Sequence, residues 1–322
     1  MPSYLPGAGR SRRARAFQSE LNQTIRVRAF AKINLGLRIL ARRRDGYHEI
    51  RTVYQTIGLH DRLEVSLRKG GRGVAVECND PNLPSGPGNL VFRACEIWRE
   101  ARRFRGGIHV TIRKAIPAGS GLGGASSDAE AALAGLERLT GDRLGSAVRL
   151  ALAAKLGSDV PFFFFGGRAL GCGRGQEVYP LEDLPARPCL VVFPGFAIST
   201  AEAYREVSRW LTKTRNAPSM EEFGAWPQYF PTGWGPAEND FERVVFARWP
   251  ELARVKRQLI QAGAETASLT GSGSALFAIF ESARRLVRTC KMLPKGWRSF
   301  RTRTIPRATY KRRLFEAVKS DK

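Results

Sequence analysis

The sequence predicts an α+β fold in two domains, and three of its features indicate this. The chain has 322 residues, of which 43% are hydrophobic, enough to bury more than one core. From Ile25 to Ile39 every second residue is apolar, a pattern typical of a strand with one buried face. Later, a glycine-rich loop joins an alternating segment to a helical one. We expect domains at residues 24–185 and 186–290.

The strand at residues 25–39 comes first along the main chain. Its odd positions are apolar, and its even positions are mostly Arg, Lys, Asn and Gly. The pattern fits one long strand or two strands joined by a bend. Because side chains alternate along a strand, Lys32 and Asn34 project together from the face opposite the core. Without further context, a solvated strand face is the simpler interpretation of these two residues.

A turn around Asp45-Gly46 follows, in the segment RRRDGYHEI. It presents Tyr47 and His48, a ring that can stack beside an imidazole that can form hydrogen bonds. Such a pair at a strand start is also compatible with ordinary packing.

The segment PAGSGLGGASSD, residues 117–128, is the strongest functional signal. Four glycines lie at positions 119, 121, 123 and 124, where they allow the main chain to approach a ligand closely. A helix beginning near Ser126 would direct free N–H groups and its positive dipole end at an anion. Apolar residues alternate at 108–112 and recur at helical spacing from Ala129. We predict a phosphate-binding loop, with a tight turn between packed elements as the alternative.

The spacing of these glycines also matches the dinucleotide-binding pattern G-x-G-x-x-G. A dinucleotide fold needs a second strand that ends in an acid about 20 residues further on. Here Asp142 is followed instead by another helical pattern, residues 148–156. A P-loop is excluded as well, because no G-K-[ST] follows the glycines.

The segment KLGSDVPFFFFGG, residues 155–167, carries the second candidate group. A helix closes at Gly157, and Asp159 then stands two residues before Pro161 and an apolar aromatic run. The carboxylate there is either a turn-forming residue or a positioned catalytic acid.

The net charge of +24 lies mostly at the two ends of the chain. Residues 1–28 hold six Arg against one Glu, and residues 284–322 hold fourteen Lys or Arg against two acids. We interpret residues 1–23 and 291–322 as solvated basic extensions, rather than as an RNA-binding arm. We also expect a surface loop at residues 210–236, which are rich in Trp, Pro and Gly.

The apolar runs and the cysteines limit the class of protein. No apolar run reaches the roughly 20 residues of a membrane helix, so we expect no membrane partner. The five cysteines are widely spread and contain no C-x-x-C pair, which predicts neither a disulfide framework nor a zinc site and favours the cytoplasm. We expect a monomer or a weak homodimer.

Taken in order, AKINLGL, RRRDGYH, PAGSGLGGASSDA, LGSDVPFF and LTGSGSALF resemble the GHMP small-molecule kinases, from about Thr24 to Phe280. Within that superfamily the chain is most similar to the 4-diphosphocytidyl-2-C-methyl-D-erythritol kinases of the non-mevalonate isoprenoid pathway. The resemblance implies a first domain like domain 2 of ribosomal protein S5 and a ferredoxin-like second domain. It also implies phosphorylation of the substrate's 2-hydroxyl by ATP, with Mg²⁺ as the accompanying ion.

The resemblance assigns roles residue by residue. Lys32 and Asp159 match the residues at the reacting centre, where Asp159 orients or deprotonates the acceptor hydroxyl and Lys32 compensates negative charge. The substrate contacts match Asn34, Tyr47, His48, Thr200 and Tyr204. The ATP contacts match Asn89, Leu90, Pro117, Ala118, Gly119, Ser120, Gly121, Leu122, Gly123, Gly124, Ala125, Ser126, Ser127 and Asp128.

The loop departs from the family pattern, approximately GGLGGGSS, because Ser120 and Ala125 replace two glycines. Both must adopt negative φ, or the loop is strained. Ser126 or Ser127 is expected near Mg²⁺, and the sequence identifies no protein carboxylate ligand for it. The turn Thr270–Ser274 is either part of the site or only a tight turn.

Two alternative functions stay open at this point. Another GHMP kinase, acting on mevalonate, homoserine or a sugar, would share the glycine loop but not the Tyr47, His48 and Tyr204 set. A non-enzymatic RNA-binding protein would use the basic ends, since a related α+β fold occurs among ribosomal proteins.

Overall fold

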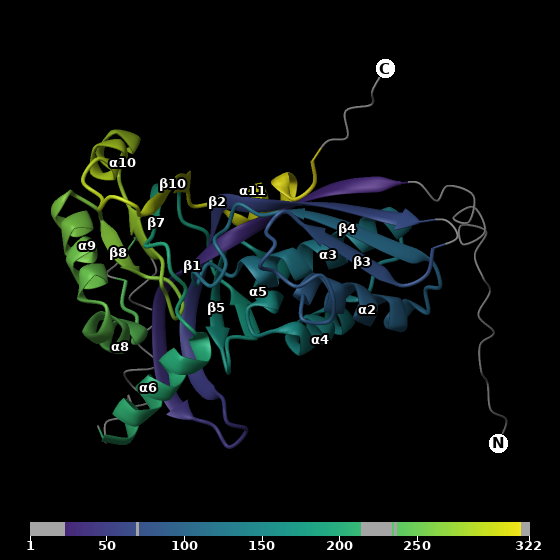
Figure 1. The fold of residues 1–322 in the computed structure, drawn as a ribbon, viewed down its shortest axis with the longest axis horizontal. Helices are drawn as coiled ribbons and strands as arrows, with labels where there is room; N and C mark the ends of the chain where they lie inside the picture. Colours follow the sequence, from purple (N-terminus) through teal and green to yellow (C-terminus); the bar gives the residue numbers. More distant parts are fainter. Residues whose placement is uncertain (1–22, 69–70, 214–233, 235–236, 317–322) are drawn as a thin grey trace.

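The structure, a computed structural model, describes residues 23–68, 71–213, 234 and 237–316 (Figure 1). Nearly all of the expected N-terminal extension and most of the expected loop at 210–236 lie outside the described residues. Within the described chain, two sheets with their own helices form two domains. The predicted two-domain α+β class is therefore confirmed.

The first domain is built on a six-stranded sheet in the order β3-β4-β2-β5-β6, with β1 also paired to β2. β3 and β4 run parallel, whereas β1, β4 and β5 each pair with β2 antiparallel. The strands are β1 (Thr24–Arg42), β2 (His48–Arg68), β3 (Val74–Cys78), β4 (Gly107–Arg113), β5 (Arg168–Cys172) and β6 (Glu177–Pro180).

The alternation at residues 25–39 forms one continuous strand. β1 spans 19 residues, and its register with β2 shifts between Phe30 and Lys32, between Asn34 and Gly36, and between Ile39 and Ala41. Such irregularities bend a strand and re-aim its side chains. The β1–β2 hairpin consequently extends from the first domain to the edge of the second, where its tip lies beside α6 (Figure 1).

Four helices cover one face of the first sheet (Figure 1). They are α2 (Leu90–Arg102), α3 (Gly124–Thr140), α4 (Ser146–Leu156) and α5 (Val160–Phe165). α3 packs closely because Gly135 leaves room for the side chains of Val65 and Val27, to which a Cβ would come within 3.2 Å. It begins at Gly124, two residues before the expected start. The aromatic run Phe162–Phe165 lies within α5.

The second domain is an antiparallel sheet in the order β10-β7-β9-β8. Its strands are β7 (Pro188–Phe193), β8 (Thr266–Leu269), β9 (Leu276–Ile279) and β10 (Arg298–Arg303). Around it lie α6 (Thr200–Lys213), α8 (Phe241–Arg248), α9 (Pro250–Gln261) and α10 (Ala283–Cys290). Leu190, Phe241, Val255, Leu276 and Leu286 share its buried apolar core.

Residues up to 316 are built into the fold, which corrects the expectation of a solvated extension at 291–322 for the part of it that the structure describes. β10 pairs with β7 over six residues, and α11 (Arg307–Arg313) follows it. Ile305 and Tyr310 are buried beside Phe30, and the Tyr310 hydroxyl donates to the carbonyl of Phe163. The charge count did not reveal these buried side chains, because exposed arginines flank them along the chain.

None of the helices in the described part of the chain is long and apolar enough to cross a bilayer. The five cysteines carry free thiols.

Candidate active site

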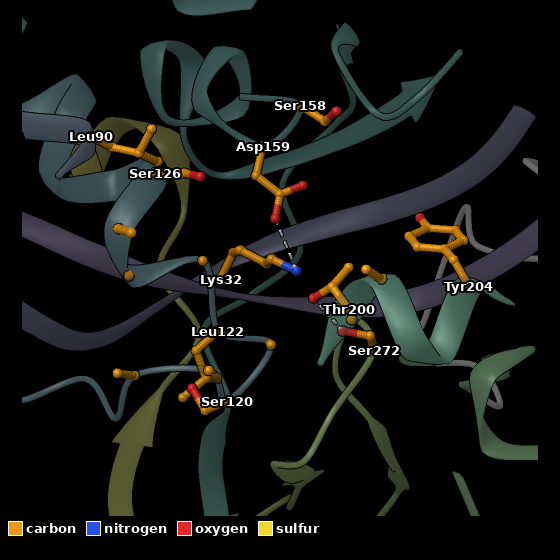
Figure 2. A pocket seen from close by; sticks show the side chains of 18 of the residues that line it. Lys32, Leu90, Ser120, Leu122, Ser126, Ser158, Asp159, Thr200, Tyr204 and Ser272 are labelled. Atoms are coloured by element: carbon orange, nitrogen blue, oxygen red, sulfur yellow. Dashed lines mark hydrogen bonds and ion pairs between the residues drawn. The ribbon is translucent and has the colours of Figure 1, made fainter. Parts of the chain in front are cut away.

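A cavity of about 1070 Å³ lies where the two domains meet. β1, the glycine loop and the start of α5 contribute to it from the first domain, and α6 and the turn at 271–272 from the second (Figure 2). Every predicted site residue lines this cavity except Ser127. The fold thus gathers into one place side chains that the sequence distributes over more than 170 positions.

Lys32 and Asp159 face each other across the centre of the cavity (Figure 2). The Lys32 Nζ lies 3.4 Å from Asp159 Oδ2. Lys32 is only 3% exposed, so it does not belong to a solvated strand face. Asp159, at the start of α5, keeps 31% of its side chain exposed. The pair therefore places an ammonium beside a carboxylate that an incoming molecule can still reach.

Asn34 holds Lys32 in place from the same strand. Its Oδ1 accepts a hydrogen bond of 2.7 Å from Lys32 Nζ, and its Nδ2 donates to Thr52 Oγ1 at 2.7 Å. The Gly271 amide also donates to Asn34 Oδ1, at 2.8 Å. The buried Asn34 amide thus links the lysine to the second domain.

Tyr54 is a residue of this site that the sequence reasoning missed. Its hydroxyl donates to Asp159 Oδ1 at 2.9 Å, and its side chain is buried. Burial, reinforced by the neighbouring Asp159 carboxylate, raises the pKa of the phenol well above its ordinary value. In the sequence Tyr54 looks like one more large residue of a buried strand, and no local signal marks it as functional.

The glycine loop has the backbone conformation that its glycines permit. Gly119, Gly121 and Gly123 have φ values of 62°, 80° and 73°, which favour glycine. A Cβ at position 121 would lie 2.0 Å from the Thr270 carbonyl oxygen. Among the described residues, Arg103 is the one non-glycine with positive φ, so Ser120 and Ala125 both satisfy the expectation of negative φ.

The first turn of α3 faces the cavity without a side-chain cap. Its leading N–H groups are therefore available to an anion, as the loop hypothesis requires. The two serines of this turn differ. Ser126 lines the cavity, whereas the Ser127 hydroxyl donates to the Phe30 carbonyl at 2.7 Å and fastens α3 to β1.

The turn Thr270–Ser274 packs against the glycine loop, and part of it lines the cavity. The Thr270 hydroxyl donates to the Gly121 carbonyl at 3.2 Å, and Gly271 and Ser272 line the cavity. Ser272 Oγ lies 2.9 Å from Thr200 Oγ1, which comes from the start of α6. The second domain thus closes one side of the glycine loop.

Three of the predicted substrate contacts meet at the far end of the cavity. The His48 ring stacks on Tyr204 with centroids 4.8 Å apart. The His48 Nε2 lies 2.7 Å from Ser208 Oγ, and burial, followed by the nearby Arg42, lowers the pKa of His48. The Tyr47 ring is 53% exposed and has the Arg174 guanidinium 4.4 Å from its centroid. Flat rings are therefore present on both the hairpin and α6.

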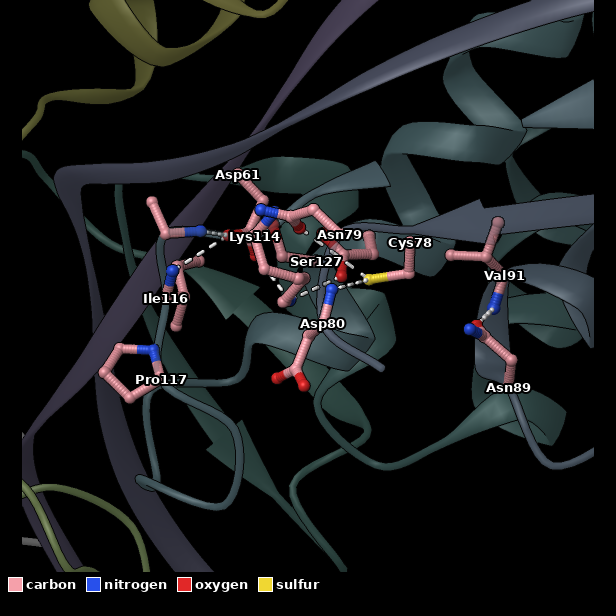
Figure 3. A network of polar contacts seen from close by, with 12 residues as sticks. Asp61, Cys78, Asn79, Asp80, Asn89, Val91, Lys114, Ile116, Pro117 and Ser127 are labelled. Carbon is pink, nitrogen blue, oxygen red and sulfur yellow. Dashed lines mark hydrogen bonds and ion pairs between the residues drawn. The ribbon is translucent and has the colours of Figure 1, made fainter. Parts of the chain in front are cut away.

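The opposite end of the cavity holds a buried charge cluster (Figure 3). Lys114 Nζ lies 2.5 Å from Asp61 Oδ2 and 2.6 Å from Asp128 Oδ2. Burial raises the pKa of Asp128 to about 8, although Lys114 opposes this shift. Burial also opposes the charge of Lys114, but Asp128 and Asp61 outweigh it and raise the pKa of Lys114. The sequence reasoning included Asp128 and missed Lys114 and Asp61, which in the sequence look like ordinary exposed charges.

Asn89 and Leu90 lie at the same end. The Asn89 side chain accepts from the Val91 amide at 2.8 Å and caps α2, and its Nδ2 donates to the Pro84 carbonyl at 2.8 Å. Asn89 thus orders the loop beside the cavity, and Leu90 adds an apolar surface to the cavity wall.

Comparisons with known proteins show the family to which the chain belongs. The model of the GHMP kinases N terminal domain matches residues 89–167, and that of the GHMP kinases C terminal domain matches residues 233–297. A 4-diphosphocytidyl-2-C-methyl-D-erythritol kinase of Solibacter usitatus is 42% identical over 302 residues, which cover 92% of this chain and 94% of the relative. The enzyme of that name in Geobacter sulfurreducens is 36% identical, covering 87% and 98%.

Solved structures show the same fold. A crystal structure of a 4-(cytidine 5'-diphospho)-2C-methyl-D-erythritol kinase matches with a TM-score of 0.70 at 33% identity, covering 87% of this chain and 99% of that one. The mevalonate kinase of Methanococcus jannaschii matches with a TM-score of 0.63 at 15% identity, covering 88% and 98%. At that identity the second likeness concerns the fold alone.

Proposed function

The chain belongs to the 4-diphosphocytidyl-2-C-methyl-D-erythritol kinases within the GHMP kinases, and on this basis we propose how its cavity carries out the transfer. The enzyme is an ATP-dependent small-molecule kinase of isoprenoid precursor synthesis. We assign the 2-hydroxyl of the cytidyl substrate as the acceptor. The observation that carries the proposal is the Lys32–Asp159 pair, which lies between an anion-binding loop and an aromatic end in a single cavity.

The glycine loop and the start of α3 bind the ATP phosphates in this proposal. Positive φ angles turn the loop backbone towards the cavity, and the uncapped helix start adds its dipole. Asn89, Leu90 and the Lys114 cluster then lie on the nucleotide side. Phosphoryl transfer proceeds through a loose transition state, so catalysis depends on positioning and charge compensation.

Mg²⁺ fits this arrangement as an ion held mainly by ATP. The described residues contain no group of three His, Cys, Asp or Glu suited to a metal, and Mg²⁺ commonly takes one or two protein ligands beside phosphates and water. Ser126 is the loop serine that would contribute an oxygen, because the Ser127 hydroxyl is bonded to Phe30. When bound, the ion neutralises phosphate charge.

Asp159 and Lys32 act on the acceptor side. Asp159 orients the substrate hydroxyl and accepts its proton as the new bond to phosphorus forms. Lys32 compensates the negative charge that develops on the hydroxyl oxygen, and Asn34 keeps the ammonium aimed at that point. Holding both reactants in line supplies much of the rate enhancement.

Tyr47, His48 and Tyr204 hold the cytidine part. Tyr47 offers an exposed face for stacking, and Tyr204 offers a second ring from α6. The Ser208 hydroxyl donates to the Tyr204 carbonyl, so Ser208 accepts from His48 Nε2, which leaves Nδ1 as an acceptor for the base edge. Thr200 lies beside this group, at the start of α6.

A direct assay tests the proposal. The purified chain is incubated with ATP, Mg²⁺ and the cytidyl methylerythritol substrate, and the product is identified by ³¹P NMR. We expect ADP and a new phosphomonoester at the 2-position. Mevalonate and homoserine serve as control acceptors in parallel reactions. Turnover of either control acceptor without turnover of the cytidyl substrate would contradict the proposal.

Tyr204→Ala is expected to raise KM for the cytidyl substrate by about two- to tenfold and to change KM for ATP little. The lost stacking is worth about 0.5–1.5 kcal/mol, and 1.4 kcal/mol corresponds to a factor of ten in affinity. Steady-state kinetics with each substrate varied in turn measure the effect. Tyr179→Ala is the matched control, because Tyr179 is 54% exposed on β6 and lies outside the cavity lining. An unchanged KM in Tyr204→Ala would reject the assignment.

A further inference from the structure

We propose that Tyr54 is a positioning residue, whose phenol holds the Asp159 carboxylate in the orientation that receives the acceptor hydroxyl. This inference rests on the proposed function, because it requires Asp159 to act at the reacting centre. The role is separate from the substrate and nucleotide contacts assigned above.

The two oxygens of Asp159 have different partners. Oδ1 accepts the hydrogen bond from Tyr54 at 2.9 Å, while Oδ2 lies 3.4 Å from Lys32 Nζ. Asp159 is the N-cap residue of α5, yet its side chain makes no capping hydrogen bond to that helix. Its orientation is therefore set by side chains of the neighbouring strands, Tyr54 on β2 and Lys32 on β1.

Tyr54 is itself held rigidly. Its side chain is 1% exposed, and its ring lies 4.8 Å from that of Phe162 on α5. A Cβ at Gly171 would come within 2.4 Å of Tyr54 Cε2, and one at Gly175 within 2.5 Å of the hydroxyl oxygen. Two glycines at β5 and the turn after it thus make the space that the phenol occupies.

The chemistry of the phenol suits this task. A buried phenol with a raised pKa stays protonated at neutral pH and can donate a single hydrogen bond. Two acceptors are within reach of that proton, Asp159 Oδ1 at 2.9 Å and the Gly175 carbonyl at 3.4 Å. The shorter contact is the one to Oδ1, so Oδ2 is the oxygen that faces Lys32 and the acceptor. Without the hydroxyl, the carboxylate can rotate about its χ2 torsion, which is broad for aspartate. Fewer Asp159 conformers are then aligned for proton transfer.

Tyr54→Phe tests the inference, because it removes the hydroxyl and keeps the ring. We expect kcat to fall about tenfold, with KM for both substrates and the thermal midpoint nearly unchanged. A merely structural role would instead lower the thermal midpoint or change KM. Tyr179→Phe is the matched control, since it removes an exposed phenol on β6 and should leave kcat unaltered.

A double-mutant cycle with Asp159→Asn gives the deciding measurement. If Tyr54 acts through the carboxylate, Tyr54→Phe lowers kcat in the native background and has little further effect in the Asp159→Asn background. Single-turnover measurements at high enzyme concentration quantify the residual rates. A kcat of Tyr54→Phe within twofold of the native value, or an equal loss in both backgrounds, would overturn the inference.

Three further outcomes are also decisive. If Tyr54→Phe does not fold, Gly171→Ala provides the second variant, because its Cβ displaces the ring while the hydroxyl remains, and we expect the same selective loss of kcat. If Asp159→Asn alone keeps near-native kcat, the catalytic assignment of the proposed function fails and the role of Tyr54 fails with it. If Asp159→Asn is impaired and Tyr54→Phe is not, the role of Tyr54 fails alone.

Discussion

Asp159→Asn is expected to lower kcat by roughly 10²–10⁴-fold, the range attributed to a positioned general base. The substitution keeps the size of the side chain but removes the negative charge, so the residue neither accepts the hydroxyl proton nor pairs with Lys32. Its 31% exposed side chain makes a large loss of stability unexpected. Steady-state kinetics give kcat, and calorimetry with a non-hydrolysable ATP analogue gives the nucleotide affinity, which should be unchanged.

Asp142→Asn is the matched control, because that aspartate is 57% exposed and pairs with Arg102 on the surface. It makes the same chemical change away from the cavity and should keep native turnover.

Lys32→Ala should also reduce kcat far more than ATP affinity. It should lower the thermal midpoint as well, since it removes the buried hydrogen bond between Lys32 and Asn34. Near-native turnover in either site variant would remove that residue from the reacting centre.

Deletion of residues 298–322 is expected to abolish stable folding. It removes the β10 ladder from β7 and the buried side chains of Ile305 and Tyr310, which pack against Phe30. Burial of each such side chain is worth about 1.5–3 kcal/mol, and whole domains are stable by only about 5–15 kcal/mol. Thermal unfolding followed by circular dichroism measures the effect, and we expect loss of the cooperative transition.

Deletion of residues 317–322 is the control for this truncation. It leaves β10, α11 and the bond from the Glu316 amide to the Arg26 carbonyl in place, so its thermal midpoint and kcat should match those of the full chain. A native thermal midpoint after deletion of residues 298–322 would instead restore the interpretation of this segment as a dispensable basic extension.

Much of the site could be predicted because its signals are local in the sequence. Alternation over Ile25–Ile39 defines β1 and places Lys32 and Asn34 on one face of it. The spacing of Gly119, Gly121 and Gly123 requires a loop with positive φ, and the structure has these angles. In such cases a few neighbouring residues determine the conformation, so a short window carries the information.

The missed residues lack such a signal because their roles depend on distant partners. Tyr54 and Asp159 are separated by 105 residues, and nothing near Tyr54 distinguishes its phenol from that of a core tyrosine. In the sequence, Lys114 and Asp61 look like surface charges. In the folded chain they form a buried ion pair, and Lys114 also pairs with Asp128 on α3. For the C-terminal residues the composition predicted a solvated extension, which was wrong for the described part. Exposed arginines there outnumber the few buried side chains that attach the segment to the fold.

Local patterning was enough to predict the two-domain class and a loop with positive φ angles, and the resemblance of the motifs was enough to predict the kinase family. Packing between distant segments settled the rest: Thr270 lies against Gly121 across 149 residues, Tyr54 reaches Asp159, and β10 completes the second sheet. The physical reason is that backbone conformation follows from near neighbours, whereas burial and hydrogen-bond partners exist only after the chain has brought remote surfaces together.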